Sequence, residues 1–444
     1  MLTDLCLISA LLVAAHLLRA AVPWMSRYLL PSSMIAGLLA LLVGPGGYDL
    51  LPFSRNAVGD PNLASYPGVL ITLLFATLLL GHRAADRGAR RWRSSSTSFL
   101  YNFSAELMQY GVTLCVGVAL LAWIFTDVAT EFIVMLPAGF AGGHGTAAAY
   151  ADALPDWQPA RSVGFTFATI GILVAVFGGL ILVDLARRFG WVTVEGPRGD
   201  GALTAEQSAF VTAKAQTALG RTTVNGIALD TLAWHFALVF AVYGAATALL
   251  PELRALLPPN IVLPGFAVAM LLGGALQALL EVARVGEFVD ARIIHHIGSL
   301  MADFLVAFGI ASINAQIVVE YAVPLAVFSV MGLALSVGWL LLVTPRIYGK
   351  DWFAQGIFTY GWNTATIAFG VALLRVVDKR TDSPVLTDYG IAYVAIGPLE
   401  ALLYTVVLAA LASGYLLATG ASLIVLALAM ILAARYLARN TKIV

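Results

Sequence analysis

The sequence predicts an all-α integral membrane protein made of two inverted five-helix repeats, each with a re-entrant hairpin between its fourth and fifth helices, and one extra C-terminal helix. Three observations predict this fold class: the composition, the spacing of the apolar runs, and short motifs that recur in both halves. Of the 444 residues, 60% are hydrophobic and only 11% are charged, whereas soluble domains have about 25% charged residues. A lipid bilayer is therefore the expected solvent of most of the chain.

Apolar runs long enough to cross a bilayer, which takes roughly 20 residues, occur in two sets of five. They lie near 3–21, 28–44, 66–81, 99–125 and 162–184, and again near 230–250, 260–281, 297–315, 321–344 and 388–411. We therefore expect a first repeat at 1–185, a cytoplasmic linker at 186–228 and a second repeat at 229–412. An eleventh run near 416–434 predicts an extra helix and tail at 413–444, packed on a scaffold or at a dimer interface.

Two further segments, at about 130–155 and 353–375, are apolar but too rich in Gly, Thr, Asn and His for ordinary spans. Each lies between the fourth and fifth helices of its half. Irregular backbone at membrane depth is tolerated only where protein or water satisfies its N–H and C=O groups. We therefore expect both segments to be re-entrant hairpins whose tips border a polar cavity.

Basic residues in short loops mark the cytoplasmic side of a membrane protein. The loop after the third span contains Arg83, Arg87, Arg90, Arg91 and Arg93. With that loop inside the cell, the N-terminus lies outside and the C-terminus is cytoplasmic, in a multi-pass protein of the inner (cytoplasmic) membrane. An odd number of spans per half reverses the second half, so the first hairpin should enter from outside and the second from inside.

Internal repetition supports the two-repeat arrangement. In the second span of each half, Leu30-Pro31 recurs as Leu263-Pro264. In the hairpins, Gly143-His144-Gly145-Thr146-Ala147 recurs as Gly361-Trp362-Asn363-Thr364-Ala365. In the fifth spans, Gly164, Phe167, Ile170 and Gly171 recur as Gly390, Tyr393, Ile396 and Gly397. Biased composition is the alternative source of such matches. Three matches in the same order favour a shared ancestral unit.

The first hairpin contains a candidate substrate site at Gly142, Gly143, His144, Gly145 and Thr146. Glycines let the backbone come close to a ligand, and a short helix that starts near Thr146 would direct its free N–H groups at an anion such as a carboxylate. His144 could hydrogen-bond the substrate, carry protons or bridge two backbone carbonyls. We therefore expect a small anionic substrate at this position.

The second hairpin supplies Trp362, Asn363, Thr364 and Thr366 to the same candidate site. The side-chain oxygens of Asn363, Thr364 and Thr366 beside an unwound backbone are hard ligands of the kind that coordinate sodium. Polar capping of helix ends explains them equally well. The sequence therefore names Asn363 and Thr364 as candidate sodium ligands.

Carboxylates within membrane spans are costly and therefore mark candidate functional sites. The candidates are Glu106, Asp303 and Glu400, and we expect either Asp303 or Glu400 to bind a sodium ion or a proton. Asn102, Glu106 and Gln109 follow the i, i+4, i+7 spacing of one helix face, so that face should line a cavity or an interhelical seam away from lipid.

Several function classes are disfavoured by the sequence. It contains no phosphate-binding Gly-Lys-Ser/Thr loop and no His-Glu-x-x-His motif, which disfavours an ATP-driven pump and a zinc hydrolase. The net charge of zero gives no field that would attract nucleic acid. We therefore expect no enzyme activity and no cofactor.

Several motifs are similar to those of the bacterial sodium:glutamate symporter family. They are Gly142-Gly143-His144-Gly145-Thr146-Ala147-Ala148, Tyr28-Leu29-Leu30-Pro31 with Ala36-Gly37, Leu107-Met108-Gln109, Ala168-Thr169-Ile170-Gly171, and Val343-Thr344 with Arg346, Gly349 and Lys350. The resemblance spans roughly residues 24–412 and implies a sodium-coupled glutamate importer, a homodimer whose substrate domain moves against a scaffold. The second hairpin departs from the family, because Trp362, Asn363 and Thr364 replace small residues.

The leading hypothesis is a secondary active transporter that couples sodium to the symport of glutamate or a related small acidic amino acid or dicarboxylate by alternating access. Na⁺ is then the coupling ion, and the partners are a small anionic substrate, the lipid bilayer and a second copy of the chain. One alternative is a proton-coupled organic-anion transporter, based on His144, Asp303 and Glu400. A channel or a non-transporting membrane sensor is an alternative of another class.

Overall fold

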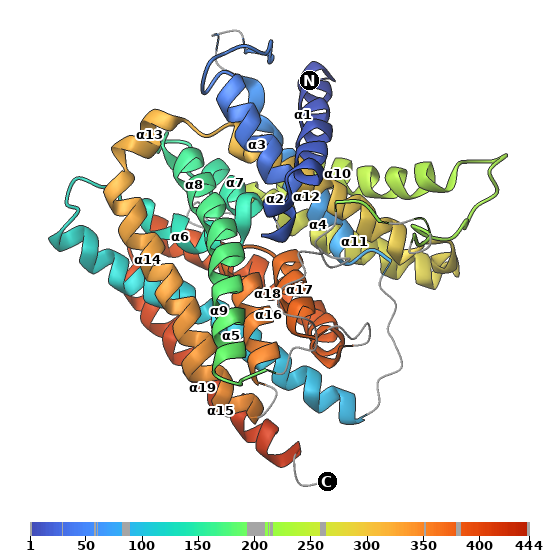
Figure 1. The fold of residues 1–444 in the computed structure, drawn as a ribbon. Coiled ribbons are helices and arrows are strands. Elements are labelled where there is room, and N and C mark those ends of the chain that lie inside the picture. The colour runs from blue at the N-terminus through green and yellow to red at the C-terminus, as the bar shows by residue number, and fades with distance from the viewer. Residues whose placement is uncertain are drawn as a thin grey trace.

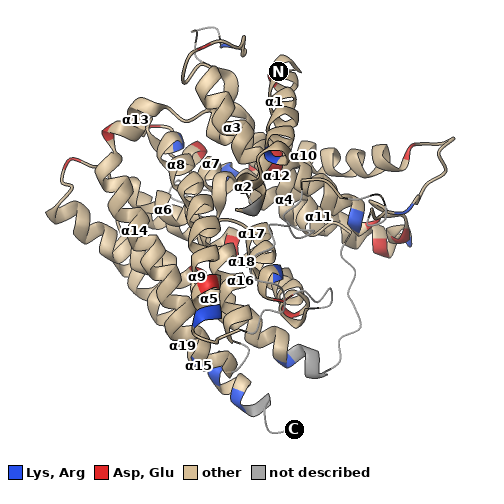
Figure 2. Cartoon of the chain, viewed as in Figure 1, with Lys and Arg blue, Asp and Glu red and all other residues tan. Residues whose placement is uncertain are grey.

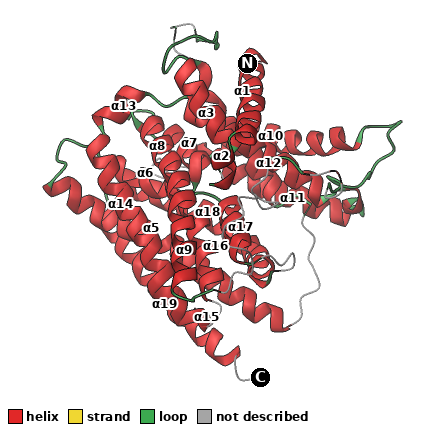
Figure 3. Cartoon of the chain, in the orientation of Figure 1, coloured by secondary structure: helices red, strands yellow, loops and turns green. Residues whose placement is uncertain are grey.

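The computed structural model describes residues 2–28, 30–56, 59, 61–81, 89–192, 209–211, 213, 216–257, 263–349, 352–378 and 383–441. Throughout these residues the regular structure is helical and no strand occurs (Figure 3). Nine helices of this part of the chain are long and apolar enough to cross a bilayer. The predicted class, an all-α membrane protein, is confirmed. Arg83 and Arg87 of the basic loop, and Lys350, lie outside the described residues.

The helices of the first half begin at the N-terminus and end before the linker. They are α1 (Leu2–Ala21), α2 (Pro23–Arg27), α3 (Ser32–Val43), the 3₁₀ turn η1 (Asn62–Ser65), α4 (Tyr66–Leu78), α5 (Ala89–Trp123), α6 (Phe132–Phe140), α7 (Gly143–Ala153), α8 (Ala160–Leu173), the π-helical segment η2 (Val174–Gly178) and α9 (Gly179–Arg188). The segments α8, η2 and α9 form one continuous helix.

The second half also has a broken pair of helices between its fourth and fifth long helices, and one more helix follows. It contains α10 (Thr231–Ala255), α11 (Gly265–Val282), η4 (Gly286–Phe288), α12 (Ala291–Ala311), α13 (Ala315–Glu320), α14 (Ala322–Gly338), the π-helical segment η5 (Trp339–Val343), α15 (Thr344–Tyr348), α16 (Trp352–Thr364), α17 (Ile367–Val377), α18 (Pro384–Ala412) and α19 (Leu416–Thr441). The segments α14, η5 and α15 are again continuous.

Two of the eleven expected spans form shorter helices than predicted. The runs near 28–44 and 66–81 contain α3, with 12 residues, and α4, with 13, fewer than the roughly 20 that cross a bilayer. Helix α3 ends where Gly44, Pro45, Gly46 and Gly47 follow it, and Pro45 cannot donate the backbone hydrogen bond that would continue the helix. Hydrophobicity alone overestimated these two lengths, since it does not register the Pro and Gly that end a helix.

The helices pack into two groups that lie side by side (Figure 1). In one group, α3 and α4 pack on α12, α1 packs on α3, α11 packs on α4, and α10 packs on α11. The other group contains α5 to α9 and α14 to α19, with α6 and α7 packed on α8 and with α16 packed on α17. Charged residues are sparse along the helices of both groups, as Figure 2 shows. Most helical positions of the two groups are therefore uncharged.

Helices α3 and α11 begin in the same way. Each is preceded by a proline, Pro31 with φ −71° and ψ 140°, and Pro264 with φ −71° and ψ 139°. Proline has no N–H to leave unpaired and its fixed φ suits the start of a helix. The matched Leu-Pro motifs therefore have equivalent structural positions in the two halves.

The start of α12 is tied to the end of the linker by Asp290. Its carboxylate accepts the N–H of Arg292 (2.8 Å) and of Arg221 (3.0 Å), while its own N–H donates to Nε2 of His235 (2.8 Å). Burial raises the pKa of Asp290, but the backbone hydrogen bonds outweigh it and the pKa is lowered overall. The carboxylate thus holds α10, α12 and the linker together.

The extra helix α19 packs along α5 of the same chain. The two backbones approach closely at two glycines: a Cβ on Gly111 would lie 2.9 Å from the carbonyl oxygen of Gly420, and a Cβ on Gly420 would lie 2.9 Å from that of Gly111. Small residues permit such close approach between membrane helices. Helix α19 therefore packs on the helix group that contains both candidate hairpins, and its place on a scaffold or at a dimer interface stays a prediction.

We expect Gly420→Leu to destabilise the protein by about 1–3 kcal/mol, the usual cost of overpacking a tight contact. Thermal unfolding of the purified protein in detergent measures the effect. Gly244→Leu on α10 is the matched control, since a Cβ at that position meets no atom within 4 Å. Equal unfolding temperatures for the two variants would contradict the packing described here.

Candidate functional site

The first candidate hairpin consists of α6 and α7, which are separated by a break at Ala141 and Gly142. Helix α7 begins at Gly143, three residues earlier than the expected start near Thr146. Gly143 has φ +66°, a left-handed conformation that glycine adopts at no steric cost. The run of glycines is therefore needed at the turn between the two arms, and the helix starts as soon as the turn is complete.

The second candidate hairpin consists of α16 and α17, which are separated by a break at Ala365 and Thr366. Thr366 is extended, with φ −154° and ψ 166°, and precedes the first residue of α17. The hydroxyl of Thr364 donates to the carbonyl of Tyr360 at 2.6 Å. That hydroxyl oxygen still has lone pairs available for a cation. The hydrogen bond is therefore compatible with both roles that the sequence left open, which are sodium coordination and capping of a helix end.

The two breaks lie against each other. A Cβ on Gly143 would lie 3.3 Å from the carbonyl oxygen of Ala365 and 3.6 Å from Cγ2 of Thr366. Helices α7 and α17, each with 11 residues, both start at this point. The first N–H groups of a helix have no partner within it, and the helix dipole is positive there. Two positive helix ends therefore converge where the sequence predicts an anion.

His144 is buried at the start of α7, where it meets elements of both helix groups. Its Nε2 lies 3.2 Å from the hydroxyl oxygen of Thr169 on α8, and its ring is stacked with Phe165 at a centroid distance of 5.8 Å. A Cβ on Gly309 of α12 would lie 2.8 Å from Cδ2 of this ring. A side-chain hydroxyl rather than two backbone carbonyls is therefore the partner of this histidine.

Gly145 brings α7 close to α4. A Cβ at this position would lie 2.0 Å from Cδ1 of Ile71. Of the glycines in the first motif, Gly143 touches the other break, whereas Gly145 faces the neighbouring helix group. The motif therefore combines a turn with a close helix crossing.

Trp362 and Asn363 are both buried on α16. The Trp362 ring lies 5.5 Å from that of Tyr389 on α18. The Oδ1 atom of Asn363 is buried and accepts no hydrogen bond from the described residues. A buried amide oxygen without a donor is costly, so this atom is suited to a ligand.

A π-helical segment supports the second hairpin. The hydroxyl of Tyr360 on α16 donates to the carbonyl of Val174, at the start of η2, at 2.8 Å. Such segments open the backbone ladder of a helix and occur often at functional sites. The carbonyl that the π-helical segment exposes is thus satisfied by the hairpin.

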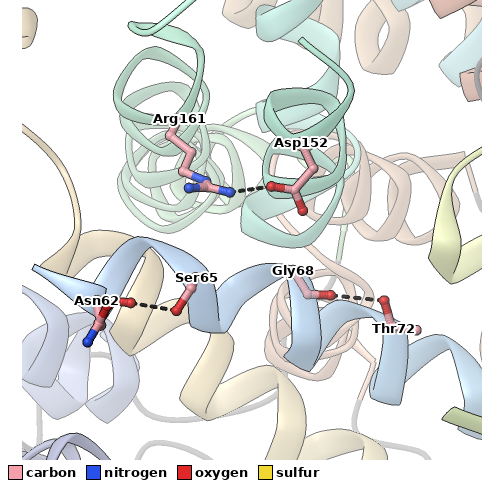
Figure 4. Close-up of polar contacts among 6 residues, drawn as sticks. All are labelled: Asn62, Ser65, Gly68, Thr72, Asp152 and Arg161. Atoms are coloured by element: carbon pink, nitrogen blue, oxygen red, sulfur yellow. Dashed lines mark hydrogen bonds and ion pairs between the residues drawn. The ribbon is translucent and has the colours of Figure 1, made fainter. Parts of the chain in front are cut away.

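The far end of α7 is fixed by an ion pair between Asp152 and Arg161, shown in Figure 4. The Asp152 carboxylate lies so close to α4 that a Cβ on Gly68 would be 2.5 Å from its Oδ2. On α4, the Thr72 hydroxyl donates to the carbonyl of Gly68 at 2.9 Å. The first hairpin is therefore anchored at its end as well as at its tip.

Glu106 on α5 and Glu400 on α18 form a buried acidic pair. The hydroxyl of Tyr404 donates to Oε1 of Glu106 at 3.3 Å, and that of Tyr393 donates to Oε2 of Glu400 at 3.5 Å. Glu106 is 1% exposed and Glu400 is 5% exposed. Tyr404 follows Glu400 by one turn of α18 and so links the two residues. Sequence reasoning named both residues but did not predict that they would meet.

Asn102, Glu106 and Gln109 are all buried, as their i, i+4, i+7 spacing predicts. The hydroxyl of Thr359 on α16 donates to Oδ1 of Asn102 at 2.8 Å. This face of α5 therefore packs against the second hairpin and α18 rather than lipid.

Asp303 lies apart from the hairpin tips. It is on α12, where its carboxylate interacts with the side chains of Ser33 on α3 and His16 on α1. No described contact connects it to Glu400 or to the breaks. Asp303 and Glu400, which the sequence named as equivalent candidates for binding a sodium ion or a proton, therefore lie at separate positions.

Sequence reasoning missed the tyrosines around the acidic pair. Tyr389, Tyr393 and Tyr404 lie on the same face of α18 as Glu400, at spacings of 4, 7 and 4 residues. Tyr110 on α5 and Tyr150 on α7 complete the cluster, because both interact electrostatically with Glu106. The helical spacing along α18 was the available signal, but Tyr393 was considered only as a repeat match.

A cavity of about 760 Å³ opens at the ends of α5, α7 and α18 and the start of α19. Its lining includes Thr130, Glu131, Leu154 and Tyr415, and none of the residues at the two breaks. The cavity is therefore separate from the candidate substrate site.

We expect Gly143→Ala to impair substrate binding more than it impairs folding. The added methyl strains the backbone by roughly 1–2 kcal/mol and enters the space between the two breaks. Gly190→Ala is the matched control, because Gly190 has φ +69° but no atom within 4 Å of its Cβ position. Thermal unfolding should show similar losses in both variants, and transport should fall only in Gly143→Ala. Equal transport in both would argue against a site at this contact.

The model of the sodium/glutamate symporter family matches residues 100–370, which is more than half of the chain. The match begins within α5 and ends within α17, and so includes both broken segments. No curated protein matches the chain.

Proposed function

Because the chain belongs to the sodium/glutamate symporter family, we propose that it is a secondary active transporter that imports glutamate, or a related small acidic amino acid or dicarboxylate, together with sodium. Family membership supports a sodium-coupled transporter and implies that the chain is not an enzyme. The convergence of the α7 and α17 N-termini is the observation that supports a substrate with a carboxylate group. Carboxylates are the groups that two such positive ends would bind.

The proposed substrate site combines backbone and side-chain groups from both hairpins. Gly142, Gly143 and Gly145 let a carboxylate approach the N–H groups at the start of α7, where His144 and Thr146 add polar side chains. From the second hairpin, Asn363 and Thr366 would contact the polar end of the substrate, while Trp362 limits the volume against Tyr389. A site of this kind favours small acids over larger ones.

The proposed sodium site lies on the second hairpin. The amide oxygen of Asn363 and the hydroxyl oxygen of Thr364 are hard ligands, and the unwound carbonyl of Ala365 adjoins them. Oδ1 of Asn363 is buried without a described donor, which fits a role as a ligand. Asp303, beside Ser33, is a candidate ligand of a second sodium ion.

We propose that the two halves are inverted repeats with opposed re-entrant loops. The support is the repeated order of helices and the reciprocal packing of α3 on α12 and of α11 on α4. The start of α1 and the end of α19 point to opposite ends of the molecule (Figure 1), in agreement with an extracellular N-terminus and a cytoplasmic C-terminus. The proposed domain boundaries follow as 1–185, 186–228, 229–412 and 413–444, in the inner membrane.

Alternating access would move the two helix groups against each other. The crossings of Gly145 with Ile71 and of Gly309 with His144 lie between the groups. Small residues let the helices of the two groups approach closely at such crossings. The resemblance to the family implies that a homodimer supports this motion, and we propose the same for this chain.

Purified protein in proteoliposomes should accumulate radiolabelled glutamate or aspartate under an inward sodium gradient, and should not do so under a potassium gradient. Uptake should vanish when an ionophore collapses the sodium gradient. Failure of glutamate, aspartate and the common dicarboxylates alike would refute the proposed substrate class. Sodium-independent accumulation would refute the proposed coupling ion.

Asn363→Ala should raise the sodium concentration or substrate concentration at half-maximal uptake by roughly tenfold or more, because hydrogen bonds to charged groups contribute about 1.5–3 kcal/mol. Asn225→Ala in the exposed linker is the matched control and should transport normally. Sodium titration by thermal unfolding adds a second readout, since a bound ion stabilises the folded state. Unchanged half-maximal concentrations for both sodium and substrate would remove Asn363 from the site.

A further inference from the structure

We propose that Glu106 and Glu400 form a proton-binding site, which takes up and releases one proton in each transport cycle in addition to the sodium movement. This inference rests on the proposed function, because it assigns a second coupling ion to the same transporter. It concerns a position separate from the two helix breaks. The proton would be shared between two carboxylates contributed by helices α5 and α18.

Side chains of α5, α7, α11 and α18 surround Glu106 and Glu400. Tyr404 and Tyr393 donate toward the two carboxylates from α18, at 3.3 and 3.5 Å. The Tyr404 ring lies 6.0 Å from Tyr110 of α5 and 6.1 Å from Tyr150 of α7. Apolar contact is added by Phe266 of α11, 5.9 Å from the Tyr404 ring. Water therefore does not reach the carboxylates in this conformation.

Several buried polar atoms in this cluster have no hydrogen-bond partner among the described residues. They include Oε2 of Glu106, the hydroxyl oxygen of Tyr389, and both Nε2 and Oε1 of Gln109, whereas the hydroxyls of Tyr110 and Tyr150 interact with each other. Glu106 and Gln109 are separated by one turn of α5 and are each 1% exposed. Native interiors leave few polar atoms unpaired. So many at one position indicate that a bound species belongs there.

The charges of the cluster require a positive species. In the part of the chain that the structure describes, Glu400 and Tyr404 act on Glu106, and Tyr393 acts on Glu400, so none of these groups is basic. Tyr404, which donates to Glu106, follows Glu400 by one turn of α18. Two carboxylates that lie in the same low-dielectric interior repel each other and cannot both ionise without compensation. One shared proton removes this repulsion and gives Oε2 of Glu106 a hydrogen-bonding role.

A proton fits the surroundings better than a metal cation. The Tyr393 and Tyr404 hydroxyls point their hydrogens at the carboxylates, whereas a cation would need oxygen lone pairs pointed at it. Tyr110, Tyr150 and Tyr389 are the other titratable groups that face the pair, and all are neutral phenols at physiological pH. None of them supplies a competing charge.

The cluster also connects the two hairpins. Tyr404 interacts with Thr146 at the start of the first hairpin's second arm, while Tyr389 lies 5.5 Å from Trp362 on the second hairpin. A shift of either hairpin would therefore change the enclosure of the pair. On opening to water, the shared proton would pass to a water molecule and leave two solvated carboxylates, and the reverse step would reload the site.

Proteoliposomes that contain a trapped pH-sensitive dye test this proposal, with the membrane potential clamped. Sodium-driven substrate uptake should change the internal pH in step with uptake, and the uptake rate should depend on the external pH. Glu106→Gln and Glu400→Gln should abolish the coupled pH change. Glu320→Gln is the matched control, because it makes the same substitution at an exposed helix end and should behave as the wild type.

Infrared difference spectroscopy gives a readout that does not need transport. The wild type at neutral pH should show the carbonyl band of a protonated carboxylic acid, and the Glu106→Gln/Glu400→Gln double variant should lose it, with thermal unfolding as the check on folding. Sodium-driven uptake without any pH change, and without this band, would overturn the proton site while leaving sodium symport intact. Loss of radioactive-sodium binding in the two single variants, with no such band, would overturn it in favour of a sodium site. Absence of sodium-driven uptake altogether would refute the proposed function instead.

Discussion

The arrangement of this protein depends on one constraint, which is that a broken helix inside an apolar bundle must find partners for its backbone N–H and C=O groups. Two breaks are present, after Phe140 and after Thr364, and the structure places them against each other. Gly143, directly after the first break, and Ala365, within the second, are both buried. Each hairpin therefore forms part of the protein environment that surrounds the irregular backbone of the other.

Much of the rest of the fold serves to hold these two breaks in place. The ion pair of Asp152 with Arg161 fixes the outer end of α7, and the hydroxyl of Tyr360 occupies the carbonyl that η2 exposes. Thr359 and Asn102 connect the second hairpin to α5. Several polar residues of this membrane protein thus serve the places where regular helical bonding is interrupted.

The sequence predicted the broken helices because Gly, Asn and Thr within an apolar run indicate an interruption of the helix. Pro31 and Pro264 correctly located the starts of α3 and α11. It did not predict the short lengths of α3 and α4, because hydropathy does not register the prolines and glycines that end a helix. It also did not predict that Tyr404 would contact Glu106, since that hydrogen bond joins positions 298 residues apart and depends on how α5 and α18 pack. Local patterns determine helices, whereas the partners of a side chain follow from tertiary packing.

The contact of α5 with α19 has a consequence for how the protein is made. Gly111 and Gly420 touch, although one lies in the first third of the chain and the other near its C-terminal end. During synthesis, α5 enters the membrane long before its partner exists, so the glycine face of α5 must meanwhile be covered by lipid or by another protein. The bundle around the acidic pair cannot reach its final packing until α19 has been synthesised. A chain that lacks α19 would therefore leave α5 without this neighbour.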